Sequence, residues 1–140
     1  TSKGVLGRME ESIYGLKPKK LFLNIGTNDL ELLGDGIDGI HTRIQSIIQQ
    51  VKAFDPAIEI YLISVYPVNP LVDKATVGKR KNANIEALNA RLKTIPGVTY
   101  IDLYSKLSDG ENLKRDYTIE GLHMNQNGYE IIREALEPHL

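Results

Sequence analysis

The feature of this chain that most constrains its fold is the alternation of short, almost continuous apolar runs with longer segments of helical periodicity. The apolar runs lie at residues 21–25, 58–65 and 98–103. Short runs of this kind, bounded by Pro and Gly, are typical of strands buried on both faces, and such strands occur in parallel sheets. The pattern therefore predicts three parallel strands.

Apolar residues around these runs recur at the spacing of an amphipathic helix. We predict helices over residues 5–16, 37–51 and 85–95, and a last helix that Asn125 caps and whose apolar face is Tyr129, Ile132 and Leu136. Residues 104–124 are predicted to form a long loop. Strands that alternate with helices at these lengths favour βαβ units with right-handed crossovers, hence an open parallel α/β sheet covered by helices.

Length and charge narrow the class of protein. At 140 residues the chain fits one domain, over residues 1–140, with a single core. The net charge is −1, with 17 basic and 18 acidic residues interspersed, so binding to nucleic acid or to an anionic membrane surface is not expected. No apolar run approaches the roughly 18 to 20 residues that span a bilayer. Without Cys there is no disulfide framework and no Cys-based zinc site.

The N-terminus raises the questions of processing and localisation. The chain begins at Thr1 and the helical pattern starts at once, which indicates that something upstream has been removed. No signal peptide is visible, because basic and apolar leader regions are missing. A Cys-free chain fits any redox compartment, so the localisation stays unassigned, with a slight preference for the cytoplasm.

The first candidate site motif is Gly26-Thr27-Asn28-Asp29, directly after the first predicted strand. In open α/β sheets, binding and catalysis concentrate at the C-terminal ends of the strands. Gly26 can adopt a special backbone conformation there, and Asn28 can offer a neutral amide donor to the crevice. Taken alone, the motif is better explained by Asn and Asp side chains that cap the next turn.

The second motif is Glu120-Gly121-Leu122-His123, ahead of the last helix. A carboxylate that accepts from one imidazole nitrogen holds the tautomer of the ring and leaves the other nitrogen to act as a general base. The alternative is a surface His near a helix start. The other two His residues, His41 at a helix opening and His139 near the C-terminus, are predicted to face solvent.

Together the two motifs resemble the SGNH (GDSL-type) hydrolase family, in their order, contexts and separation. The run 21–29 is similar to that family's Gly-x-Asn-Asp block, and the run 117–129 is similar to its acid and base block, including Asn127-Gly128-Tyr129. Secondary matches are Ser64-Val65-Tyr66-Pro67 and the segment from Asn82 to Asn89. The resemblance covers essentially the whole chain.

The resemblance implies a three-layer α/β/α fold with a parallel, flavodoxin-like sheet of order 2-1-3-4-5, whose first two strands are missing from this chain. It also implies a serine ester hydrolase in which His123 is the base, Glu120 the acid and Asn28 the oxyanion donor, with Gly26 and Asp29 supporting the oxyanion loop. No metal or organic cofactor is implied. The substrate is a small ester, and acetyl or other short-chain esters, carbohydrate acetyl groups and lysophospholipids all stay open.

Two departures from the family pattern matter. Glu120 stands where the family usually has Asp, so the loop must absorb one extra methylene. The family's Gly-Asp-Ser nucleophile block is not found in this chain, and no Ser sits at a strand-to-helix elbow: Ser2, Ser12, Ser46, Ser64, Ser105 and Ser108 all lack that context. Ser64 lies inside an apolar run and is predicted to bond its hydroxyl to the backbone.

These departures lead to two hypotheses. In the first, an N-terminal segment absent from this chain supplies the Ser. In the second, the chain is a catalytically inactive module that keeps the fold and the crevice for binding. The first hypothesis also predicts that the edge of the strand at 21–25 is paired with that N-terminal segment or with a second copy of the chain.

Overall fold

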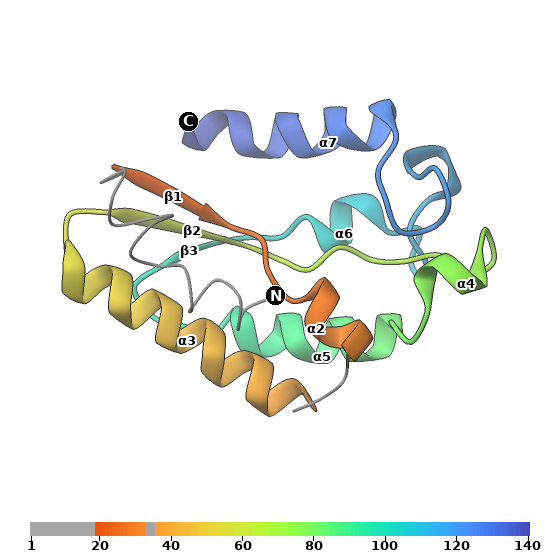
Figure 1. Ribbon diagram of the computed structural model, residues 1–140. Helices are drawn as coiled ribbons and strands as arrows, with labels where there is room; N and C mark the ends of the chain where they lie inside the picture. The colour runs from red at the N-terminus through yellow and green to blue at the C-terminus, as the bar shows by residue number, and fades with distance from the viewer. Residues whose placement is uncertain (1–18, 33–35) are drawn as a thin grey trace.

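The computed structural model describes residues 19–32 and 36–140, which form a parallel sheet covered by helices (Figure 1). The strands are β1 (Lys20–Leu23), β2 (Glu59–Ile63) and β3 (Thr99–Ile101), and they pair in the order β1-β2-β3. Leu62 in the central strand lies opposite Leu23 on one side and Tyr100 on the other. This order agrees with the last three strands of the predicted sheet. The helix predicted at 5–16 lies outside the described residues.

The helices lie on both faces of the sheet, which confirms the three-layer α/β/α fold (Figure 1). The α-helices are α2 (Thr27–Leu32), α3 (Gly36–Phe54), α4 (Lys74–Val77), α5 (Asn82–Leu92), α6 (Tyr104–Leu107) and α7 (Gln126–Leu136). Two short 3-10 helices are η2 (Arg115–Tyr117) and η3 (Glu137–His139). Among the described residues, no helix has the length and apolar character needed to cross a bilayer.

Side chains that alternate along the strands build two cores, one on each face of the sheet, which corrects the predicted single core. Leu23, Ile60 and Leu62 pack on one face with the buried stripes of α3 and α5: Ile40, Ile44, Ile47, Ile48, Val51, Ile85, Leu88 and Leu92. The other face carries Phe22 and Tyr61, whose rings stack with centroids 4.8 Å apart, and it packs under α6 and α7. Because both faces are buried, the strands read as continuous apolar runs in the sequence.

The structure corrects the predicted long loop at 104–124, which contains α6 and η2. It also adds α2 and α4, which the sequence pattern did not indicate. These helices are four to six residues long, too short to repeat an apolar stripe over two turns. The third predicted helix ends at Leu92 rather than Ile95, although Ile95 still packs into the core.

The last helix begins as predicted, because the side chain of Asn125 accepts from the backbone NH of Gly128 at 3.0 Å. The prediction that Tyr129 lies on its apolar face is wrong. Ile132 is buried and Leu136 packs partly against the core, whereas 61% of Tyr129 is exposed. Tyr129 is in the first turn of α7, where it borders a pocket instead of the sheet.

The two His residues predicted to face solvent are half-buried instead. His41 lies inside α3 rather than at its start, and its Nε2 is buried without a hydrogen-bond partner in the described part of the chain. The ring of His139 lies 5.2 Å from that of Tyr61, on the face of the sheet that α7 covers. This contact forms because the C-terminal end of the chain lies over β2. The spacing of residues near His139 in the sequence does not indicate it.

Candidate active site

The turn after β1 places Asn28 at the C-terminal edge of the sheet. Gly26 has a φ of +127°, and a Cβ there would lie 3.0 Å from Val65 and 3.1 Å from Leu88, so only glycine fits this turn comfortably. Its carbonyl accepts from the NH of Leu30 at 2.9 Å and starts α2. Asp29 is buried and pairs with Arg43 of α3 at 3.4 Å. Gly26 and Asp29 thus hold the loop on either side of Asn28.

Glu120 and His123 contact each other directly. Nδ1 of His123 lies 3.1 Å from both Oε1 and Oε2 of Glu120. Oε1 also accepts from the backbone NH groups of His123 and Leu122. The bond from the NH of His123 is the main reason that the pKa of Glu120 is lowered, with the imidazole and the NH of Leu122 adding to the shift. Glu120 therefore reaches His123 despite its extra methylene.

The loop that carries His123 is closed by internal hydrogen bonds. The hydroxyl of Thr118 donates to the carbonyl of His123 at 2.7 Å and accepts from the NH of Gly121 at 2.8 Å. The carbonyl of Gly121 accepts from the NH of Asn69 at 2.8 Å. Gly121 has a φ of +97°, and a Cβ would collide with the backbone oxygen of Asn69. The loop is therefore fixed against the segment that follows β2.

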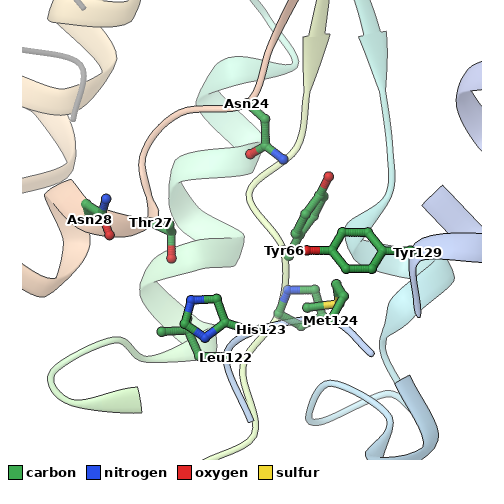
Figure 2. A pocket seen from close by; sticks show the side chains of 9 residues that line it. Asn24, Thr27, Asn28, Tyr66, Leu122, His123, Met124 and Tyr129 are labelled. Atoms are coloured by element: carbon green, nitrogen blue, oxygen red, sulfur yellow. The ribbon is translucent and has the colours of Figure 1, made fainter. Parts of the chain in front are cut away.

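Asn28 and His123 line one pocket of about 290 Å³ (Figure 2). Its remaining wall comes from Asn24, Thr27, Tyr66, Pro67, Leu122, Met124 and Tyr129. The two candidate residues therefore share one crevice at the C-terminal ends of the strands. Glu120 lies beside His123 and does not line the pocket itself. The side chain of His123 is 66% exposed.

Several pocket residues were missed as site residues by sequence reasoning. Tyr66 is half-buried, and burial raises the pKa of its hydroxyl, while a hydrogen bond with the side chain of Asn24 lowers it. Tyr66 and Tyr129 lie on the side of the pocket away from Asn28 in Figure 2. Both tyrosines occur in segments that resemble the hydrolase family, and this resemblance could have identified them as site residues. Asn24 lies within an apolar run, and nothing in its sequence context indicates a site residue.

Two Asn residues of α5 hold the backbone that leads into the pocket. The side chain of Asn89 accepts from the NH of Val65 at 2.8 Å and donates to the carbonyl of Val65 at 3.0 Å. Asn82 makes the same pair of bonds to Val68, at 2.8 and 2.9 Å. These contacts give a structural reason for the secondary match at Asn82 to Asn89.

Ser64 bonds to the backbone, as predicted. Its hydroxyl oxygen accepts from the NH groups of Leu103 and Tyr104, at 2.9 and 2.8 Å, and the residue is fully buried. The lining of the pocket within residues 19–32 and 36–140 includes no Ser. Ser2 and Ser12 lie outside these ranges. The same part of the chain holds no cluster of three or more His, Asp or Glu side chains suited to a metal ion.

Comparison with known proteins decides the family. Residues 1–131 match the GDSL-like Lipase/Acylhydrolase family. The chain belongs to this family. Its GDSL-like fold is shared with a GDSL-like lipase from Bacteroides thetaiotaomicron, which has 29% identity and a TM-score of 0.81, with 100% of this chain and 72% of that one covered.

Two further relatives place this GDSL-like chain among larger proteins. A Streptococcus pneumoniae structure, provisionally described as a platelet activating factor, has 28% identity and a TM-score of 0.91, with 99% of this chain and 67% of that one covered. The N-acylneuraminate cytidylyltransferase of Escherichia coli O18:K1:H7 is 31% identical over 118 residues, which are 83% of this chain. The match spans only 27% of that curated relative.

Proposed function

We propose that this chain forms the larger part of a serine ester hydrolase domain that acts through an acyl-enzyme. His123 is the general base, Glu120 the acid that orients it, and Asn28 the oxyanion donor. Two features of His123 carry the proposal. Its Nδ1 contacts both carboxylate oxygens of Glu120, and His123 lines the same pocket as Asn28. Membership of a lipase and acylhydrolase family supports the reaction class.

The chemistry follows from the orientation of the imidazole. With Nδ1–H donating to Glu120, Nε2 is unprotonated and can take the proton of a serine hydroxyl. The serine oxygen then attacks the ester carbonyl, and His123 returns the proton to the departing alcohol. Water repeats the sequence on the acyl-enzyme and releases the carboxylic acid. Glu120 stays ionised through the cycle, which its lowered pKa favours.

The negative charge that develops on the carbonyl oxygen needs donors already in place. Asn28 lies at the start of α2 and lines the pocket. The pairing of Asp29 with Arg43 and the tight turn at Gly26 hold this segment on both sides. A donor that does not reorganise during the reaction is worth more than one that does.

We infer that the nucleophilic serine comes from a segment before Thr1. The pocket lining within the described residues offers no Ser, and Ser64 is bonded elsewhere. The related structures are longer than this chain, which covers 67% and 72% of two of them. The proposal treats residues 1–140 as part of one hydrolase domain.

The test compares hydrolysis of p-nitrophenyl acetate with and without the upstream segment. We expect the 140-residue chain alone to release no nitrophenol through the triad, and the longer protein to show a burst followed by turnover. Removal of an oxyanion donor typically lowers kcat by about 10²- to 10³-fold, and His123→Ala in the longer protein should lower kcat at least as much.

Two results would reject the proposed mechanism. One is a burst from the 140-residue chain that His123→Ala abolishes, because it would place the nucleophile within this chain. The other is a longer protein, with its Ser in place, that binds small esters without hydrolysing them. That result would favour the inactive binding module.

A further inference from the structure

Arg80 is buried beside the first turn of α2, although it comes from the loop between α4 and α5. Its Nε donates to the carbonyl and hydroxyl oxygens of Thr27, at 3.0 and 3.1 Å. Its Nη1 donates to the carbonyl of Val77 at 3.1 Å and lies 3.5 Å from Glu31. Its Nη2 donates to Oδ1 of Asn28 at 3.1 Å. One guanidinium thus holds both Thr27 and Asn28.

The chemistry of the guanidinium decides which way the Asn28 amide points. The oxygen and nitrogen of an Asn amide are similar in size, so packing alone distinguishes them poorly. A guanidinium can only donate, and an amide oxygen can only accept. The flipped amide would set two donors against each other. With Oδ1 turned to Arg80, the NH2 group of Asn28 is left to donate elsewhere, and Asn28 lines the pocket.

We propose that Arg80 is a positioning residue that locks the amide of Asn28 with its NH2 group presented to the pocket as the oxyanion donor. The consequence for catalysis rests on the proposed function. The arrangement suits that function because the donor is fixed before the charge develops. The cation also polarises the amide it contacts, since hydrogen bonds in a chain strengthen one another.

A merely structural role is the rival explanation, because Arg80 also ties Thr27 and Val77 together. A double-mutant cycle separates the two roles in the protein that carries its upstream segment. Arg80→Met should lower kcat by about 10-fold or more, but no further than loss of the donor itself, about 10²- to 10³-fold. The double variant with Asn28→Ala should be no slower than Asn28→Ala alone. Losses in kcat that multiply would overturn the proposal.

A second measurement needs no hydrolysis and uses the 140-residue chain. In the ¹⁵N-labelled protein, the side-chain NH2 signals of Asn28 should be shifted from those of a free amide, and Arg80→Met should return them to free values. Arg80→Lys should do the same, because one ammonium cannot reach Thr27, Val77 and Asn28 together. Signals unchanged in both variants would overturn the proposal. Absence of hydrolysis in the longer wild-type protein would reject the proposed function. The Asn28 NH2 signals would then still show whether Arg80 fixes the orientation of the amide.

Glu31→Gln is the matched control. Glu31 touches the same guanidinium and accepts from the NH of Lys79 at 2.6 Å, but no hydrogen bond joins it to Asn28 among the described contacts. We expect the Asn28 signals and kcat to be retained. A drop in kcat equal to that of Arg80→Met would mean that the loop needs only general support, and would overturn the positioning role.

Discussion

At the scale of single residues, Asn28 combines two contacts of opposite character. Its oxygen accepts from Arg80, and the residue lines the pocket, into which we propose that its NH2 group donates. A substitution that keeps the acceptor and removes the donor can therefore separate stability from catalysis. Such a substitution is available, because Asp has the shape of Asn and carries only acceptors when it is ionised.

We expect Asn28→Asp to fold at least as stably as the wild type and to lose catalysis. The new carboxylate keeps the bond to Arg80 and adds a charge to it, whereas the proposed oxyanion donor disappears. In the longer protein, kcat should fall by about 10²- to 10³-fold, with no decrease in Tm. Asn28→Ala should lose kcat similarly and also lower Tm. Unchanged ester turnover in both variants would remove Asn28 from the mechanism.

Glu120 gives a pH-dependent prediction. Its pKa is lowered from the ordinary value of 4.5, mainly by the backbone NH of His123. A carboxyl group whose pKa is lower in the folded state stabilises the fold at pH values above 4.5, and this contribution is lost as the pH falls through the lowered pKa. The difference in unfolding free energy between the wild type and Glu120→Gln should shrink in that range.

A carboxyl ¹³C titration of the folded chain measures the pKa of Glu120 directly. The midpoint should lie below 4.5. A midpoint at or above this value would show that the bonds from His123 and Leu122 do not form in solution. The stability of the wild type and of Glu120→Gln can be compared by urea unfolding over the same pH range.

At the scale of structural elements, the loop at 118–123 depends on one close approach of two backbones. Gly121 and Gly110 both have a positive φ, +97° and +112°. A Cβ on Gly121 would collide with the backbone of Asn69, whereas a Cβ on Gly110 would meet nothing within 4 Å. The two positions thus carry a similar conformational penalty for Ala and differ in packing.

Gly110→Ala should lower the free energy of unfolding by about 1–3 kcal/mol, the usual cost of such a backbone conformation. Gly121→Ala should cost more, because the segment after β2 must also move. Urea unfolding of both variants measures the difference. Equal losses would show that the contact between Gly121 and Asn69 does not constrain the loop.

At the scale of the whole molecule, β1 lies at one end of the described sheet. It pairs with β2, and among residues 19–32 and 36–140 no strand pairs with its other side. Unpaired NH and carbonyl groups next to apolar side chains favour pairing with another chain. The pairing predicted from the sequence, with an N-terminal segment or with a second copy, stays a prediction.

Supplying the upstream segment as a separate peptide should raise the Tm of the 140-residue chain, because a partner that binds only the folded state stabilises it. The same mixture should hydrolyse p-nitrophenyl acetate, and a peptide with its Ser replaced by Ala should raise Tm without hydrolysis. A stable monomer whose β1 amides exchange rapidly, unaffected by the peptide, would contradict the predicted strand order.

The amino-acid sequence was enough to predict the parallel sheet, the long helices α3, α5 and α7, and the candidate residues Asn28, Glu120 and His123. Strands buried on both faces give continuous apolar runs, and helices buried on one side give a helical spacing of apolar residues, so both can be recognised from neighbouring residues alone. Glu120 lies only three residues from His123, so their contact needed one loop alone.

The short helices, the place of Tyr129 in the pocket and the partner of the Asn28 amide depend on how the chain folds back on itself. Arg80 is 52 positions from Asn28, and no local periodicity connects them. Their contact arises because the loops that follow β1 and β2 leave the same edge of a parallel sheet and fold over each other. A buried guanidinium in a polar loop looks like any solvent-facing Arg until its partners are placed around it.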